Sequence, residues 1–119
     1  MYKRQCLGDH KQFEKSCFSC CQSADFMSAL ADLGRKQVVV TGIEAHVCVN
    51  QTVHDLLAEG YSPHIITDAV SSRSHKNKEI GIEKMLSAGA IVSSVEMALF
   101  EMLVESGTEN FKAVQRLVK

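Results

Sequence analysis

The sequence predicts an α/β fold: a Rossmann-like parallel sheet in the middle of a three-layer αβα arrangement. Helical and strand patterns alternate from residue 23 onward, with short connections between them. The predicted strands are short, apolar and rich in β-branched residues, as in strands that are buried on both faces. With 119 residues, 45% of them hydrophobic, the chain is long enough for one compact domain with a core.

The first half of this pattern predicts a helix, a strand and a second helix. Ser23 is a good N-cap residue, and apolar residues at helical spacing follow it until Gly34 ends the helix. The β-branched run at 37–41 predicts a buried strand. Residues 45–59 carry apolar side chains on one face and are followed by Gly60, which predicts one continuous helix.

The second half repeats the alternation. Short strands are predicted at 64–67 and 90–93, with an amphipathic helix at 78–88 between them. Two closing helices are predicted at 95–104 and 109–118. Strands separated by helices pair in parallel through right-handed crossovers, and ligands bind at the carboxyl ends of such strands.

The beginning of the chain lacks a counterpart to these strands. No clear strand pattern occurs before residue 23, and three strands make a narrow parallel sheet. We therefore expect a partial domain whose N-terminal strands are missing.

Composition and charge exclude several classes of protein. The net charge is −1 and the 13 Lys and Arg residues are scattered, so we expect no nucleic-acid partner. No apolar run approaches the roughly 18 residues that span a bilayer, and the N-terminus lacks the apolar core of a secretory signal. The 5 cysteines are an odd number, which disfavours a fully paired disulfide framework. These features predict a soluble cytoplasmic protein with no membrane partner.

Three of the cysteines, Cys17, Cys20 and Cys21, form a C-x-x-C-C cluster. A structural zinc site would need a second pair of ligands, but Cys6 and Cys48 stand alone. A redox pair normally opens a helix after a strand, whereas this cluster precedes the first predicted strand. Unpaired thiols are the default, so we predict no metal site, and redox use of Cys17 and Cys20 stays a competing hypothesis.

Cys48 is the candidate nucleophile. A buried strand ends near Gly42 and a helix begins a few residues later, which puts Cys48 in the first turn of that helix. Backbone N–H groups and the positive end of the helix dipole stabilise a thiolate there, and the same N–H groups can hold an oxyanion. The competing interpretation is an inert thiol that faces the sheet, because free cysteine is often buried. Position alone leaves both interpretations open.

The segment G-I-E-A-H-V-C-V at 42–49 closely resembles the nucleophile motif of the isochorismatase-like cysteine hydrolases. This superfamily includes nicotinamidases, isochorismatases and N-carbamoyl amidases. The similarity continues through segments 51–61, 68–74 and 88–96. It makes residues 13–119 a partial hydrolase domain and leaves residues 1–12 as a poorly matched N-terminus, which we interpret as non-native sequence.

The resemblance implies the roles of several residues. Cys48 is the nucleophile, and Lys15 polarises the site and favours the thiolate. A non-proline cis peptide joins Ile43 to Glu44, and the backbone N–H groups of Glu44 and Cys48 form the oxyanion hole. His46 is either a substrate contact or a turn residue that satisfies local hydrogen bonds. By its charge alone, Lys15 would be assigned to the solvated surface.

The resemblance also implies an activity: hydrolysis of an amide or related bond in a small molecule, without a cofactor. The family's catalytic aspartate lies on the first strand of the complete domain, and this sequence has no matching residue, so we expect the chain alone to be weak or inactive. The alternative is a non-catalytic scaffold or interaction protein that keeps the fold. We expect homo-oligomers, because an incomplete sheet exposes an edge and apolar surface. His54 and Asp55 are expected on the solvated side of their helix.

Overall fold

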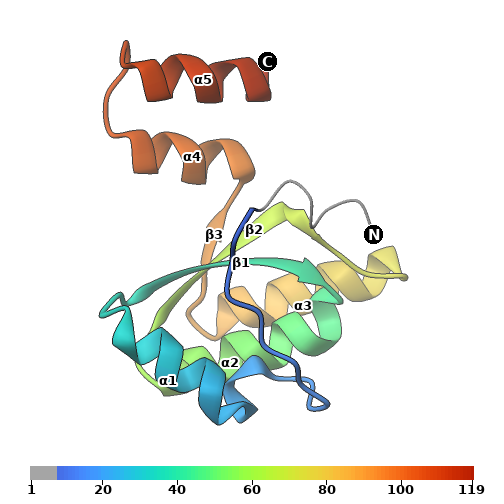
Figure 1. Cartoon of the computed structure of the whole chain (residues 1–119). Coiled ribbons are helices and arrows are strands. Elements are labelled where there is room, and N and C mark those ends of the chain that lie inside the picture. Colours follow the sequence, from blue (N-terminus) through green and yellow to red (C-terminus); the bar gives the residue numbers. More distant parts are fainter. Residues whose placement is uncertain (1–7) are drawn as a thin grey trace.

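The computed structural model describes residues 8–119 (Figure 1). Residues 1–7, which include Cys6 and belong to the segment predicted to be poorly matched, lie outside the described residues. The elements in chain order are the 3₁₀-helix η2 (Cys20–Gln22), α1 (Ala24–Asp32), β1 (Gln37–Ile43), the π-helix η3 (Ala45–Val49), α2 (Asn50–Ala58), β2 (Ser62–Ser71), α3 (His75–Ser87), β3 (Ile91–Ser93), α4 (Val95–Leu103) and α5 (Glu109–Val118). Within residues 8–119, no helix is long and apolar enough to cross a membrane.

The three strands form one parallel sheet in the order β1-β2-β3, which confirms the predicted α/β class. β1 and β2 pair on both sides of an irregularity between Val40 and Gly42. β2 is longer than the strand predicted at 64–67. Its end residues Ser62 and Ser71 pair with β1 although their polar side chains interrupt the apolar pattern.

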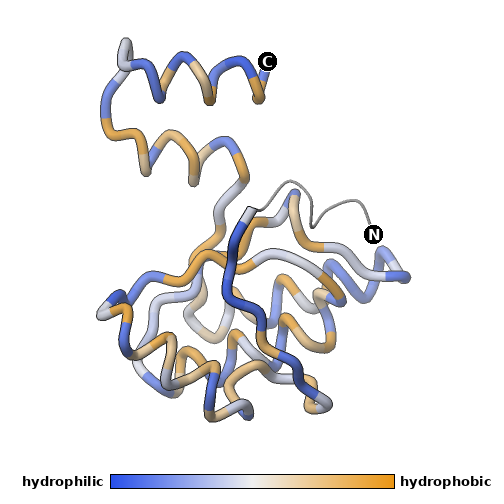
Figure 2. Tube along the Cα trace, in the orientation of Figure 1, coloured by the Kyte–Doolittle hydropathy of each residue, from blue (hydrophilic) through white to orange (hydrophobic). Residues whose placement is uncertain are grey.

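Helices α2 and α3 cover one face of the sheet, and the core lies between them and the strands (Figures 1 and 2). Burying these apolar side chains is the main favourable contribution to folding. The buried core residues are Val40, Ala45, Val49, Val53, Leu56, Ile65, Val70, Met85 and Ala90. The opposite face of β1 is more open, since the Val39 side chain there is 53% exposed.

Helices α4 and α5 extend from the opposite face of the sheet (Figure 1). The carboxylate of Asp68 in β2 accepts a hydrogen bond from the backbone N–H of Val95 at 2.9 Å, which fixes the start of α4. The rings of Phe100 and Phe111 pack edge to face with centroids 5.8 Å apart and hold α5 against α4.

Residues 45–58 are helical, close to the single helix predicted at 45–59, but they form two helices of different type. The first five residues form the π-helix η3, and α2 follows from Asn50. The wider turn is visible where the backbone N–H of Asn50 donates to the carbonyl of Ala45. An apolar stripe fixes which face of a helix is buried, but it does not distinguish a π-turn from an α-turn. Such wide turns frequently occur at functional sites.

Candidate active site

One small cavity, of about 170 Å³, brings the two predicted catalytic side chains together. Cys48 of η3 and Lys15, from the segment before η2, both line it. The described residues that line it are Lys15, Cys20, Val40, Thr41, Ile43, Cys48, Val49 and Thr52. Neither Cys20 nor Thr52 was predicted to lie at this cavity. They come together because η2 packs against α2, where the backbone N–H of Cys20 donates to the Thr52 hydroxyl.

The cavity lies at the carboxyl end of β1, where parallel sheets usually bind ligands. Val40, Thr41 and Ile43 of β1 line the cavity beside the irregularity in this strand. Within residues 8–119, β1 pairs only with β2, so its other edge has no partner strand.

Cys48 is half-buried, so it is neither sealed in the core nor on the open surface. The carbonyl of Glu44 accepts hydrogen bonds from the backbone N–H groups of Val47 and Val49, at 3.1 and 3.2 Å. These bonds fold the backbone tightly on either side of Cys48. The thiol is thereby held in the first helical turn after the strand, as its position in the sequence predicted.

The peptide bond between Ile43 and Glu44 is cis, at the position that the resemblance implied. It lies immediately before η3, and the Ile43 side chain, 70% exposed, borders the cavity. Glu44 is the N-cap of η3 and has an extended backbone. The end of β1, the cis peptide bond and the start of η3 therefore follow one another directly, a few residues before Cys48.

Lys15 is held by main-chain oxygens. Its Nζ donates hydrogen bonds to the carbonyls of Cys17 and Phe18, at 2.9 and 2.7 Å. A lysine ammonium has three donors and no acceptor, so these two bonds leave one N–H available to the cavity. The arrangement fits a positive charge that stabilises an anion there.

Asp55 fastens the lysine-bearing segment to α2. The buried hydroxyl of Ser19, only 3% exposed, donates to the Asp55 carboxylate at 2.6 Å, and Gln22 donates to the same oxygen at 3.3 Å. A second tie runs from the backbone N–H of Cys20 to the hydroxyl of Thr52 at 3.0 Å. Asp55 was expected on the solvated side of its helix, but the segment around Ser19 packs against it and leaves it half-buried.

Replacing Asp55 with alanine is expected to lower the free energy of unfolding by about 1–3 kcal/mol. The Ser19 hydroxyl would stay buried without its acceptor. The matched control is Glu59→Ala, which removes an exposed carboxylate at the end of the same helix. Urea denaturation of both variants measures the difference. Equal midpoints would show that the Ser19 contact contributes nothing.

His46 does not line the cavity. Its Nδ1 hydrogen-bonds to the hydroxyl of Ser72 at 2.9 Å, and its Nε2 lies 4.0 Å from the Glu44 carboxylate. The same carboxylate accepts from the backbone N–H of Arg73 at 3.1 Å. These contacts join the turn after β1 to the turn after β2. Of the two roles considered for His46, they fit the turn residue that satisfies local hydrogen bonds and not the substrate contact.

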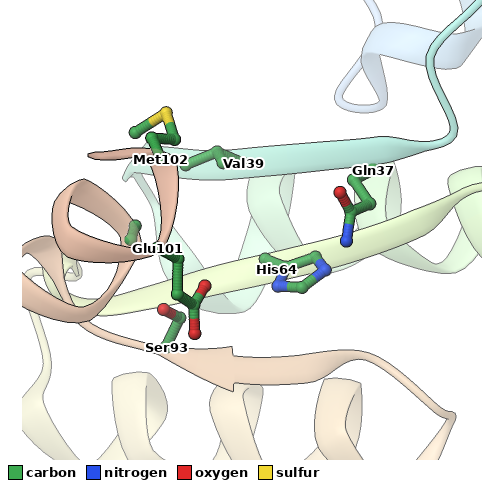
Figure 3. A pocket seen from close by; sticks show the side chains of 7 residues that line it. Gln37, Val39, His64, Ser93, Glu101 and Met102 are labelled. Atoms are coloured by element: carbon green, nitrogen blue, oxygen red, sulfur yellow. The ribbon is translucent and has the colours of Figure 1, made fainter. Parts of the chain in front are cut away.

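A larger cavity of about 560 Å³ lies between the open face of the sheet and α4 (Figure 3). It is lined by Gln37, Val39, His64, Ser93, Ala98, Glu101 and Met102. Ser93, His64 and Glu101 are the residue types of a serine hydrolase triad, which needs hydrogen bonds from nucleophile to base and from base to acid. Within the described chain no hydrogen bond joins His64 to either of the other two.

The thiols of Cys17, Cys20, Cys21 and Cys48 are all unpaired. Burial raises the pKa of the Cys21 thiol to about 11, and the hydrogen bond involving Ser19 offsets this only in part. In the described part of the chain, no group of three or more His, Cys, Asp or Glu side chains is placed to hold a metal ion.

The chain matches known proteins in sequence and in fold. The isochorismatase domain model matches residues 4–97. The chain is 44% identical over 85 residues, 71% of its length, to the secreted isochorismatase effector Isc1 of Phytophthora sojae. It is 34% identical over 111 residues, 92% of its length, to isochorismatase family protein 1B of Dictyostelium discoideum.

The fold matches a solved structure over a similar range. The structure of MAR1 ribonuclease from Caenorhabditis elegans aligns with a TM-score of 0.81 at 40% identity, over 89% of this chain and 54% of that one. The matched regions cover 40% of the Phytophthora protein and 53% of the Dictyostelium protein, so the chain spans about half the length of its relatives. The family match over most of the sequence, together with this fold, shows that the chain belongs to the isochorismatase domain family.

Proposed function

We propose that this chain carries the nucleophile of a cysteine hydrolase that cleaves an amide or related bond in a small molecule. The observation that supports this most directly is that Cys48 and Lys15 border one cavity at the carboxyl end of β1. The positive charge of Lys15 and the backbone N–H groups of the first helical turn both favour an anionic sulfur, and the thiolate is the attacking form of cysteine.

The reaction would proceed through a covalent thioester. The sulfur of Cys48 attacks the substrate carbonyl carbon, and the carbonyl oxygen gains negative charge in a tetrahedral intermediate. The backbone N–H groups of Glu44 and Cys48 are the proposed donors to this oxyanion. Breaking the C–N bond releases the amine, which leaves with a proton. Water then attacks the thioester, which releases the acid and restores the thiol.

The cavity lacks a group that can accept the thiol proton. None of the described residues that line it is an aspartate, glutamate or histidine, and a lysine ammonium has no acceptor. We therefore propose that a polypeptide segment equivalent to the unmatched half of the relatives supplies this base. It would pair with the edge of β1 that has no partner strand within residues 8–119. Without that segment, the missing base favours the alternative, a non-catalytic protein that keeps the fold.

A chimera tests the hydrolase proposal directly. Residues 13–119 of this chain would replace the matching part of C. elegans MAR1 ribonuclease, which is 40% identical. We expect the chimera to release ammonia from small primary amides or N-carbamoyl compounds, whereas the chain alone releases little. A folded chimera without activity on any of these compounds would favour the non-catalytic alternative.

Cys48 is expected to react with iodoacetamide at pH 7 at least about ten times faster than Cys17 and Cys20, because alkylation requires a thiolate. With its pKa raised to about 11, Cys21 stays protonated at neutral pH, and its labelling should increase only as the pH approaches that value. Trypsin cleavage after Arg35 and Lys36 separates Cys48 from the three-cysteine cluster, so mass spectrometry can follow both peptides. Equal, slow labelling of all thiols would contradict an activated Cys48.

We also propose that the protein resides in the cytoplasm and self-associates. The four unpaired thiols support a reducing compartment. Self-association is supported by exposed apolar side chains on the closing helices, among them Met97, Met102 and Leu117.

A further inference from the structure

We propose that Cys20 captures an oxidised Cys48, so that the two residues form a reversible disulfide that closes the cavity. Both side chains line the same cavity of about 170 Å³, whereas Cys17 and Cys21 do not. This goes beyond hydrolysis and rests on the proposed function only in taking Cys48 as a reactive thiol. The disulfide would protect the nucleophile and switch it off.

The contacts of η2 hold the backbone of Cys20 against Thr52, four residues after Cys48. The backbone N–H of Cys20 donates to the Thr52 hydroxyl at 3.0 Å. Thr52 follows Cys48 by four residues, so the two share a helix face, with their Cβ atoms roughly 5–6 Å apart. A disulfide needs Cβ atoms about 3.5–4.5 Å apart, and the cavity is the space across which the two side chains can close.

The other two thiols of the cluster are held elsewhere. Cys17 Sγ donates to the carbonyl of Ser19 at 3.3 Å, and Cys21 Sγ donates to the carbonyl of Thr52 at 3.8 Å. Cys21 also packs against the core, and burial keeps it protonated. Within residues 8–119, no such bond engages the thiol of Cys20 or Cys48. Cys20 is thus the member of the cluster that is free to face the nucleophile.

The chemistry needs a peroxide, such as hydrogen peroxide, as the oxidant. The Cys48 thiolate attacks one peroxide oxygen, the O–O bond breaks, and the departing hydroxide takes a proton to become water. Sulfur is thereby oxidised to a sulfenic acid. The Cys20 sulfur then attacks Cys48 Sγ, and the S–O bond breaks with release of a second water molecule. Two equivalents of an external thiol reduce the disulfide and restore both cysteines.

Peptide mapping after treatment with hydrogen peroxide tests the inference. Trypsin cuts after Lys15, Arg35 and Arg73, so the disulfide would join peptide 16–35 to the peptide that contains Cys48. We expect this cross-link in the wild-type chain and its loss on reduction with dithiothreitol. Alkylation of Cys48 should fall by about tenfold or more on oxidation and recover fully on reduction.

Single serine variants identify the partner of Cys48. Cys20→Ser should abolish the cross-link and drive Cys48 on to the irreversible sulfinic acid, while Cys17→Ser and Cys21→Ser should keep the cross-link. Serine leaves the backbone bond from residue 20 to Thr52 in place, and circular dichroism checks that the variant is folded. A cross-link that persists in Cys20→Ser, or sulfinic acid forming equally fast in the wild type, would overturn the inference.

The outcome is separable from the hydrolase proposal. A chimera that hydrolyses amides while Cys48 forms no disulfide would remove this inference and leave the proposed function. A Cys20–Cys48 disulfide in a chimera without hydrolase activity would support this inference and count against the proposed function.

Discussion

Replacing Cys48 with serine in the chimera is expected to lower kcat/KM for amide hydrolysis by roughly 10⁴-fold or more, as loss of a nucleophile does in other hydrolases. A serine hydroxyl is not ionised at neutral pH, and none of the described residues that line the cavity can take its proton. In the proposed mechanism Lys15 stabilises an anion, but an ammonium group cannot accept a proton from an alcohol. Ammonia release under substrate-limited conditions measures the effect.

The control for this experiment is Cys17→Ser. Cys17 lies two residues from Lys15, but its thiol points to the carbonyl of Ser19 and does not line the cavity. We expect this variant to retain activity within about twofold, since it removes no group from the reaction. Activity of the Cys48 variant within tenfold of the parent chimera would assign the nucleophile to another residue.

The second large effect is expected at Gly81, a buried position in α3. A Cβ atom placed there would lie 2.9 Å from the Cα of His46 and 3.2 Å from the carbonyl oxygen of Ala45. Glycine therefore allows α3 to approach the backbone of η3 closely, two residues before Cys48. We expect Gly81→Val to lower the free energy of unfolding by about 1–3 kcal/mol through overpacking. The gain in helix propensity from glycine to valine, a few tenths of a kcal/mol, is too small to compensate.

The matched control is Ser87→Val, which introduces the same side chain at an exposed position of α3. Its effect should stay within about 0.5 kcal/mol. Urea denaturation compares the two variants, and iodoacetamide labelling reports whether η3 has shifted. Slower alkylation of Cys48 in Gly81→Val alone would show that the contact between α3 and η3 positions the thiol. Equal stability of both variants would show that η3 can move aside freely.

The local patterns of the sequence predicted the parallel sheet and the approximate position of each helix. They succeeded because short β-branched runs between amphipathic helices have few alternative arrangements. They also placed Cys48 after the first strand, because Gly42 and the following apolar stripe mark where the strand ends and the helix begins. They did not reveal the π-turns of η3, whose hydrogen bonds leave the apolar stripe unchanged.

The remaining parts of the site depend on contacts between distant segments. Ser19 meets Asp55 across 36 positions of sequence, and Gly81 meets His46 across a helix interface. Neither pair has a periodic or spacing signal. Lys15 was selected by family resemblance. Its charge alone predicts a surface position, and Lys15 is indeed exposed although it borders the cavity. One sequence without its fold therefore predicts the position of Cys48 relative to the strand and the helix more readily than the contacts that surround it.

Within residues 8–119, β1 has one edge without a partner strand, and Cys48 lies beside the carboxyl end of the same strand. A further strand that pairs with this edge would complete the hydrogen-bonding ladder of β1 and, under the proposed mechanism, would also help determine which molecules fit beside the thiol. Under that proposal, the attacking atom and the selection of the substrate come from different parts of the fold.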